Sequence, residues 1–233
     1  HICEDLVDVS EKVTSDENLP RCVADRLETW KRLWRKQLTG LLSEEEQKGL
    51  VAELLFMRDF WLETSDEVAA LSGWVGPDGA SQDFRHGFRA VEVKSRPPSR
   101  NSFVVSSVDQ LWFDGELFVA IYPVATLGGL EGSPFSLNGL VGEVRNQLTT
   151  TAGKDRLDVH LINCGYIDRR EYDEERFVIA EPSFYRVADE FPRILEHQVQ
   201  AGVEDIRYSV NLHWCEDYRL EREEFKEALN GRN

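Results

Sequence analysis

The chain has 233 residues, of which 41% are hydrophobic and 30% are charged, and its formal net charge is −16. This composition excludes wholesale disorder, and the length fits one large domain that can bury a core without disulfides or structural metal. The negative charge argues against a protein that coats nucleic acid through a basic surface, but it leaves room for a local basic strip or a cation-dependent site.

The chain shows no sign of a membrane span or of a secretory signal. No apolar run approaches the roughly 18 residues that a span needs, so we expect a soluble protein that does not bind a membrane. Acidic residues stand where a signal peptide would be basic, and the chain opens with His1 rather than Met, as after loss or processing of the true N-terminus. The four cysteines are irregularly spaced, which favours a reducing, cytoplasmic location.

Helical patterns dominate the first quarter of the chain. Residues 1–20 are acidic and weakly patterned, and we interpret them as a loose arm. An amphipathic helix is predicted from about Ala24 to Leu38. The next helix has a clearer start, because Ser43 followed by Glu46 is typical of a capping box, and hydrophobic residues recur at helical spacing as far as Leu62.

After Gly73 the pattern changes to short segments rich in β-forming residues, separated by loops with Gly and Pro. The predicted strands are Gln82–Arg85, Phe88–Ser95, Ser102–Ser106 and Glu116–Ala125. Helical segments follow from about 137 to 162. The last third is mixed, with predicted strands near Phe177–Ile179 and Arg207–Leu212 and a charged closing helix from about Tyr218 to Leu229.

These elements predict one α/β (α+β) domain in three parts. Residues 1–42 form an N-terminal arm and helix, residues 43–133 form the core, and residues 134–233 form a mixed α/β extension that packs on the core.

Chemistry concentrates in the first two predicted strands. His86-Gly87 is predicted as a two-residue hairpin loop, because Gly at the second loop position tolerates a positive φ. This register pairs Asp83 with Ala90 and puts Asp83, Glu92 and Lys94 on one face. Asp83 and Glu92 become diagonal neighbours with Cα atoms roughly 7–8 Å apart, close enough for both carboxylates to hold one cation.

Two carboxylates beside an ammonium group suit phosphodiester hydrolysis. Hard oxygen ligands favour Mg²⁺ or Mn²⁺, and a neighbouring Lys94 can orient a water and steady charge on a phosphate. The alternative is that Glu92 and Lys94 are only solvated residues on a strand whose other face is apolar. The other Glu-x-Lys triplets of the chain lie in helical patterns, and we interpret them as solvated.

Asp83, followed nine residues later by Glu92-Val93-Lys94, resembles the signature of the PD-(D/E)XK phosphodiesterase superfamily. That resemblance implies a restriction-endonuclease-like core, with a central mixed β-sheet flanked by helices. A preceding helix often contributes a further Glu there, and Glu53 is in the right place, although an ordinary Glu at the boundary of the helix is the alternative. The residue before Asp83 is Gln82 rather than Pro, which departs from the signature.

The resemblance covers most of residues 45–213 and extends to a bacterial branch called PD-(D/E)XK motif proteins. It is carried by Gly73-Trp74-Val75-Gly76-Pro77 and Ser106-Ser107-Val108-Asp109-Gln110-Leu111, among other segments. Members of that branch are similar to components of anti-phage defence clusters. The resemblance therefore implies DNA as the substrate and other defence-system proteins as partners.

The resemblance also implies roles for individual residues. Asp83 and Glu92 would bind Mg²⁺ (or Mn²⁺) with help from the Val93 carbonyl, Lys94 would position the water, and Glu53 would support the metal or a second cation.

Further contacts are less specific. Gln110 could contact phosphate or the metal-bound water, or it could simply cap a loop. A local excess of positive charge, formed by Arg85, Arg89, Arg96 and Arg100, could contact DNA phosphates, or it could be a solvated face that balances nearby acids.

Two functions follow. The first is a divalent-metal-dependent endonuclease that hydrolyses DNA phosphodiester bonds in bacterial defence. The alternative is a nuclease-fold subunit for DNA docking or assembly, with no activity alone. The intact set of Asp83, Glu92 and Lys94 favours the first, and the acidic charge favours the second. A homodimer would suit cleavage of both strands, but no self-complementary face is identifiable.

Two His/Cys pairs have the residue types that ligate zinc. His160 with Cys164 and His213 with Cys215 could ligate zinc, but their spacings are unlike those of familiar zinc fingers, and Cys and His are common in cores. We therefore expect core residues there rather than a zinc site.

Overall fold

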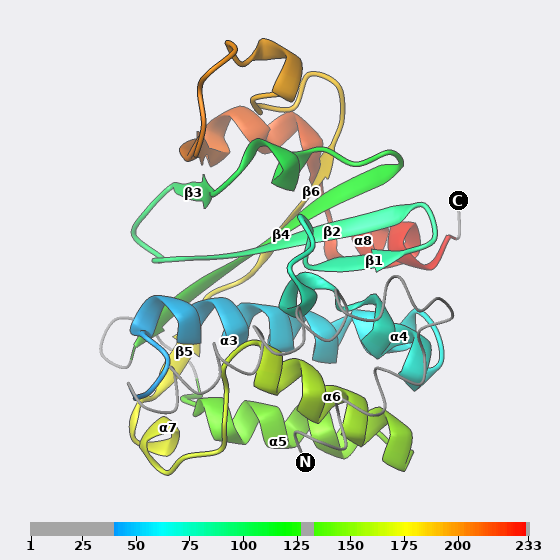
Figure 1. Ribbon diagram of the computed structural model, residues 1–233, viewed down its shortest axis with the longest axis vertical. Coiled ribbons are helices and arrows are strands. Elements are labelled where there is room, and N and C mark those ends of the chain that lie inside the picture. The colour runs from blue at the N-terminus through cyan, green and yellow to red at the C-terminus, as the bar shows by residue number, and fades with distance from the viewer. Residues whose placement is uncertain (1–39, 127–132, 232–233) are drawn as a thin grey trace, which may run out of the picture.

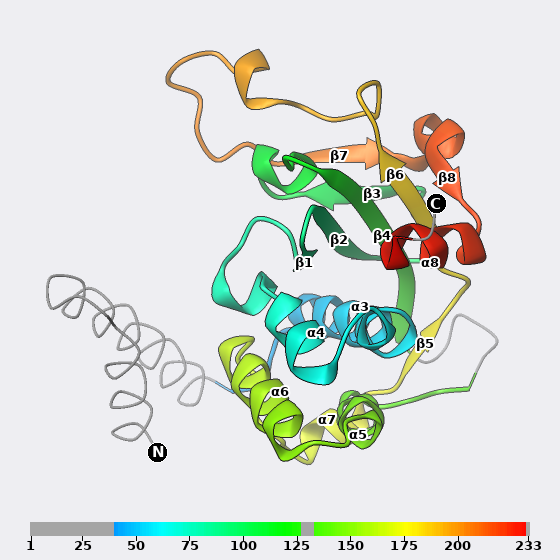
Figure 2. The same ribbon diagram turned by 90° about the vertical axis from the view of Figure 1, so that its right-hand side faces the viewer.

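The computed structural model describes residues 40–126 and 133–231, and the helix predicted at 24–38 lies outside them. A mixed β-sheet forms the middle layer, with helices on one face and a small second sheet on the other (Figures 1 and 2). This arrangement confirms the predicted fold class. Across the described residues, no helix combines the length and apolar character needed to cross a bilayer.

Helix α3 (Glu44–Asp59) begins where the capping box predicts. The Ser43 hydroxyl accepts a hydrogen bond from the Glu46 amide (3.3 Å), and the Glu46 carboxylate accepts one from the Ser43 amide (2.9 Å). The helix ends earlier than its hydrophobic pattern suggests, because a 3₁₀ turn over Trp61–Glu63 takes up the last apolar positions. A further short helix, α4 (Glu67–Gly73), was not predicted.

The hairpin of β1 (Phe84–His86) and β2 (Arg89–Arg96) exists, but its predicted register is wrong. Phe84 pairs with Val91 and His86 pairs with Arg89, so the loop is Gly87-Phe88 rather than His86-Gly87. Gly87 occupies the first loop position with φ 60°, as type II′ turns prefer. This register also brings two fully buried residues, Phe84 and Val91, side by side.

The shift keeps every side chain on its predicted face, because each residue moves by two positions relative to its partner. Continued one residue beyond β1, the register puts Asp83 directly opposite Glu92. The diagonal placement of these two residues predicted from the sequence is therefore wrong, and they are nearer neighbours than expected.

Strand β2 pairs in parallel with β4 (Glu116–Thr126). Beyond β4 the sheet continues antiparallel through β6 (Ser183–Val187) and β8 (Arg219–Leu220), and β5 (Phe177–Ile179) pairs with the end of β4. Strand β6 was not predicted. The proposed division at residue 133 stays a prediction, and β6 and β8, which follow it, belong to the same sheet as β2 and β4.

Strand β3 (Ser102–Val105) leaves the central sheet and pairs with β7 (Tyr208–Asn211). This small sheet, together with a 3₁₀ segment over Leu212–Tyr218, covers the upper face of the central sheet in Figure 2. The closing helix α8 (Arg222–Asn230) therefore starts later than predicted.

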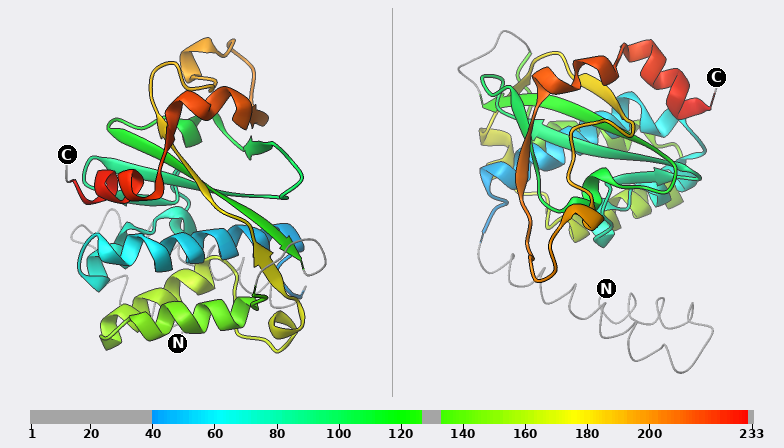
Figure 3. Two further views of the ribbon diagram at one scale, coloured as in Figure 1. Left: turned by 180° about the vertical axis from the view of Figure 1, so that it is seen from behind. Right: turned by 90° about the horizontal axis from the view of Figure 1, so that it is seen from above.

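The other face of the sheet is covered by helices. Helix α3 lies against β2 and β4, and α5 (Leu137–Gln147), α6 (Thr151–Asn163) and α7 (Glu171–Glu174) form an outer layer (Figure 1). Helix α8, drawn in red in Figure 3, lies along β6, where Phe225 stacks on Phe184 with ring centroids 4.4 Å apart.

Strand β4 is the centre of both hydrophobic cores. Phe118 and Ala120 belong to the core between sheet and helices, whereas Val119 and Ile121 belong to the core under the small sheet. A strand buried on both faces is nearly all apolar. The parallel partner β2 is thus fixed against a rigid neighbour, and its charged residues are held in defined places.

Two glycines should respond oppositely to substitution. A Cβ on Gly73 would lie 2.6 Å from the Arg85 carbonyl oxygen and 2.9 Å from the Trp61 ring, whereas a Cβ on Gly142, inside α5, would meet nothing within 4 Å. Gly73→Ala should lower the free energy of unfolding by about 1–3 kcal/mol through overpacking. Gly142→Ala should raise it by about 0.5–1 kcal/mol. Urea unfolding of both variants tests this, and equal effects would contradict it.

Candidate active site

Asp83 is fixed where β1 gives way to the preceding loop. Its backbone carbonyl accepts hydrogen bonds from the amides of Val75 (2.8 Å) and Gly76 (3.0 Å). Its carboxylate Oδ2 accepts the Val93 amide at 2.7 Å, and thereby caps an N–H of β2 that the short β1 does not reach. The side chain thus replaces a missing strand residue and is held beside β2.

Glu92, Lys94 and Gln110 form a second part of the site. The Lys94 ammonium lies 2.7 Å from Glu92 Oε1 and donates to Gln110 Oε1 at 2.9 Å. Gln110 Oε1 also accepts the Ser106 amide at 2.8 Å, so this side chain joins β2 to the turn after β3. The side chain of Glu92 is 1% exposed and that of Lys94 is 13% exposed, so the ion pair is shielded from water.

Glu53 approaches the same region from α3. Its Oε2 accepts a hydrogen bond from the indole Nε1 of Trp74 at 2.7 Å. Trp74 is fully buried, and its ring contacts those of Phe84 and His160. The sequence did not predict this role for Trp74, because nothing local to Gly73-Trp74 shows which carboxylate the indole meets.

The pKa values of these carboxylates are raised, mainly by burial and for Glu53 and Glu92 also by repulsion from Asp83. Burial raises the pKa of Glu53 to about 8, and the nearby Asp83 adds to this, against the opposing effects of Trp74 and Lys94. Burial also raises the pKa of Asp83 to about 6, despite Lys94 and the Val93 amide. The pKa of Glu92 is raised well above its ordinary value by burial and by Asp83.

The three carboxylates have only one ammonium group, that of Lys94, to balance their negative charge. A divalent cation would relieve this, and the donors present are the hard oxygens that Mg²⁺ and Mn²⁺ prefer. Glu92 Oε2 is buried without a hydrogen-bond partner, as a ligand oxygen in the absence of its cation would be. The donor types of these residues therefore suit a divalent cation.

The carboxylates do not form a preorganised metal-binding site. Within residues 40–126 and 133–231, no three His, Cys, Asp or Glu side chains are grouped closely enough to hold a metal ion. One reason is visible in the contacts, since Asp83 Oδ2 is engaged by the Val93 amide and Glu92 Oε1 by Lys94. Both oxygens would have to be released from these partners before they could bind a cation.

The four arginines predicted to contact DNA are not brought together. Arg85 donates to Gln82 Oε1 (2.6 Å) and Arg89 to Glu116 Oε2 (3.0 Å), so both have partners within the protein. Arg96 and Arg100 lie near the other end of β2, about 23 Å away at 3.3 Å per residue.

Two hollows flank the first half of α3. One, of about 400 Å³, is lined by Glu53 and Asp83 together with Gly49, Gly76 and Asn163. The other, of about 490 Å³, has a mixed charged lining, which includes Lys48, Arg96, Arg100, Glu44 and Glu45. The acidic hollow and the mixed hollow thus lie on either side of one helix.

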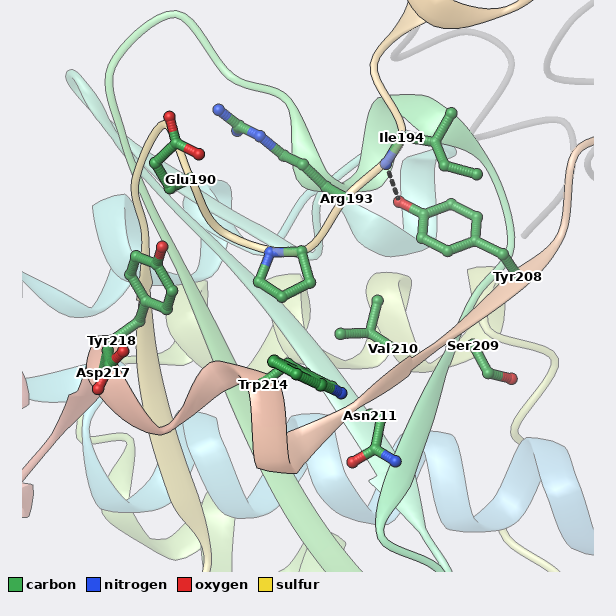
Figure 4. A pocket seen from close by; sticks show the side chains of 11 residues that line it. Glu190, Arg193, Ile194, Tyr208, Ser209, Val210, Asn211, Trp214, Asp217 and Tyr218 are labelled. Atoms are coloured by element: carbon green, nitrogen blue, oxygen red, sulfur yellow. Dashed lines mark hydrogen bonds between the residues drawn. The ribbon is translucent and has the colours of Figure 1, made fainter.

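A further pocket, of about 640 Å³, lies beside the small sheet and is shown in Figure 4. Arg193, Tyr208 and Trp214 line it, and Trp214 is 71% exposed.

The two His/Cys pairs considered as zinc ligands lie in different parts of the structure. His160 is buried against Trp74, and burial lowers its pKa to about 4. Cys215 lies in the core under the small sheet, whereas Cys164 packs against the core on the helix side.

The mixed sheet, with a paired carboxylate and lysine on β2 and a glutamate on the covering helix, defines a nuclease-like, restriction-endonuclease-like protein. A family model described as "Putative PD-(D/E)XK family member, (DUF4420)" matches residues 1–213. The chain belongs to this family, as its sequence predicted. No curated protein and no solved structure matches the chain.

The raised pKa of Glu53 predicts how stability depends on pH in the absence of divalent metal. Between the ordinary Glu value and about 8 the folded state binds more protons than the unfolded state, so stability falls as pH rises. Glu53→Gln should remove much of this slope between pH 6 and 8.5, a difference on the order of 1 kcal/mol or more.

Urea unfolding in EDTA at several pH values measures this slope. Glu45→Gln is the matched control, because Glu45 is 90% exposed on the same helix and should leave the slope unchanged. A slope for Glu53→Gln that equals the wild-type slope would contradict the assignment.

Proposed function

We propose that this protein is a divalent-metal-dependent endonuclease that hydrolyses DNA phosphodiester bonds. The observation that carries the proposal is the shielded contact of Lys94 with Glu92 and Gln110, beside Asp83 and facing Glu53. A solvated strand face would not place these charged groups out of water around one another.

Asp83 and Glu92 would hold Mg²⁺ (or Mn²⁺), with the Val93 carbonyl as a further ligand and Glu53 as support for the cation. When bound, the cation would polarise the phosphate and lower the pKa of the attacking water. Trp74 holds one oxygen of Glu53 by its indole N–H, so this carboxylate has a fixed direction before any cation arrives.

Lys94 has a geometry suited to a reacting water or phosphate oxygen. An ammonium group has three N–H donors, and Glu92 and Gln110 engage two of them. The third can donate to a water or to a phosphate oxygen on which charge develops. The two contacts restrict the rotation of the ammonium group.

The bound DNA would contact the protein beside the site. The hollow lined by Lys48, Arg96 and Arg100 begins at Ser95, the residue after Lys94, and these side chains would contact the phosphates of the bound strand. Glu44 and Glu45 line it too, so its excess of positive charge is small. Because the whole chain carries −16, we expect weak binding of DNA by the chain alone, with other proteins of a bacterial defence system helping to deliver it.

The same net charge favours a second candidate, a nuclease-fold subunit for DNA docking or assembly without activity of its own. Such a subunit has no need to bind a cation through Asp83 and Glu92. Cation binding therefore separates the two candidates.

Plasmid nicking with the purified protein tests the activity. Cleavage should require Mg²⁺ or Mn²⁺ and stop in EDTA, and Lys94→Ala should lower kcat by about 10²-fold or more, because it removes a donor aimed at the developing charge. Lys154→Ala, on α6, is the matched control and should cleave like the wild type. Metal-dependent cleavage that survives in Lys94→Ala would refute the assignment.

Calorimetric titration with Mn²⁺ tests cation binding without reference to activity. The wild type should bind Mn²⁺, and the bound cation should raise the unfolding temperature, because it binds the folded state. Asp83→Asn and Glu92→Gln should weaken binding about tenfold or more, since each removes a charged ligand. Asp189→Asn, at an exposed position, should not. Absence of Asp83-dependent binding would favour the docking subunit.

A further inference from the structure

The 3₁₀ turn over Val108–Leu111 carries Gln110, and its backbone is held by a side chain from outside the turn. Gln82 Nε2 donates to the carbonyl oxygens of Asp109 (2.6 Å) and Trp112 (2.9 Å), and lies 3.3 Å from that of Gln110. Gln82 is 1% exposed. One buried amide therefore bonds carbonyls at the end of the turn, of which that of Asp109 also accepts the Trp112 amide at 3.2 Å.

The orientation of Gln82 is itself fixed. Arg85 donates to Gln82 Oε1 at 2.6 Å, so the oxygen faces Arg85 and the NH₂ group faces the turn. This contact gives Arg85 a function within the protein that the sequence did not suggest.

A second side chain reaches the same turn from the C-terminal part of the chain. Arg193 Nη1 donates to the carbonyl oxygen of Leu111 at 2.8 Å. The backbone next to Arg193 is attached to β7, because the Ile194 amide donates to the Tyr208 hydroxyl at 3.3 Å. Figure 4 shows this bond and the Arg193 side chain extending away from Tyr208.

These contacts form a continuous path to Lys94. Gln82 and Arg193 hold the turn, the turn carries Gln110, and Gln110 Oε1 accepts both the Ser106 amide and the Lys94 ammonium. A displacement of the turn would move Gln110 and release the ammonium from one of its two partners.

We propose that Gln82 and Arg193 are positioning residues for Lys94, acting through the turn over Val108–Leu111; the inference rests on the proposed nuclease function. Gln82 stands where the family signature has Pro, which has no side-chain donor for these carbonyls. Gln82, at the position where the sequence differs from the signature, thus makes a contact that positions the turn. Arg193 makes the extension beyond residue 133 part of the support of the site.

The test combines the turnover of plasmid nicking with amide hydrogen exchange over residues 106–113, using the full chain. Gln82→Met, which keeps the side-chain length and removes the donors, should speed exchange over 106–113. It should also lower kcat about tenfold or more, with KM for DNA within about twofold of the wild type. Arg193→Leu should act in the same direction, and Arg193→Lys, which keeps a donor, should retain more activity.

Gln47→Met is the matched control. Gln47 is also a buried glutamine whose Nε2 donates to a backbone carbonyl, that of Leu42 (3.0 Å), but it does not touch the turn. Gln47→Met should lower stability without a change in kcat or in exchange over 106–113. It thereby separates a loss of stability from a loss of positioning.

Two results would overturn the inference: unchanged exchange over 106–113 in Gln82→Met and Arg193→Leu, or a kcat within about twofold of the wild type in both. If Gln82→Met does not fold, the two Arg193 variants decide. If the wild-type chain does not cleave DNA, the proposed function fails, and hydrogen exchange alone decides whether the two side chains hold the turn.

Discussion

The structure around β2 depends on one constraint: three carboxylates share a poorly hydrated space with a single ammonium group. Charges in such a place are costly unless they are paired or neutralised. The protein meets this cost with directed partners, since the Val93 amide engages Asp83, the Trp74 indole engages Glu53, and Lys94 engages Glu92. A site arranged for stability alone would have apolar side chains in these places, and their absence favours the functional role that we propose for these groups.

The elements that carry these groups differ in how firmly they are held. Strand β2 lies against β4, which is buried on both faces, and α3 packs on both strands, so Glu92, Lys94 and Glu53 sit on rigid supports. Gln110 sits on a four-residue turn without that support. The side chains of Gln82 and Arg193 compensate for it, and they join segments far apart in the chain to one small part of the site.

The sequence predicts those features that depend on local chemistry. The capping box at Ser43 and the alternation around Glu92 located α3 and β2 within a few residues, and the shared face of Asp83, Glu92 and Lys94 survived an error in register because the shift is even. The register itself depended on burying Phe84 beside Val91. The contacts of Trp74, Gln82 and Arg193 could not be predicted, because each joins residues more than 20 positions apart.

The distribution of charge bears on how such a site meets DNA. Arg85 and Arg89 have partners inside the protein. In the hollow that Arg100 lines, Arg96 also donates to backbone carbonyls and Lys48 pairs with Glu44. Few phosphate contacts against a net charge of −16 give little free energy from counterion release. Under the proposed function, specific positioning of the scissile phosphate would then come from the cation and Lys94 themselves. Under the proposed function, an acidic nuclease of this kind would act on DNA that a partner already holds, and its own surface would limit cleavage elsewhere.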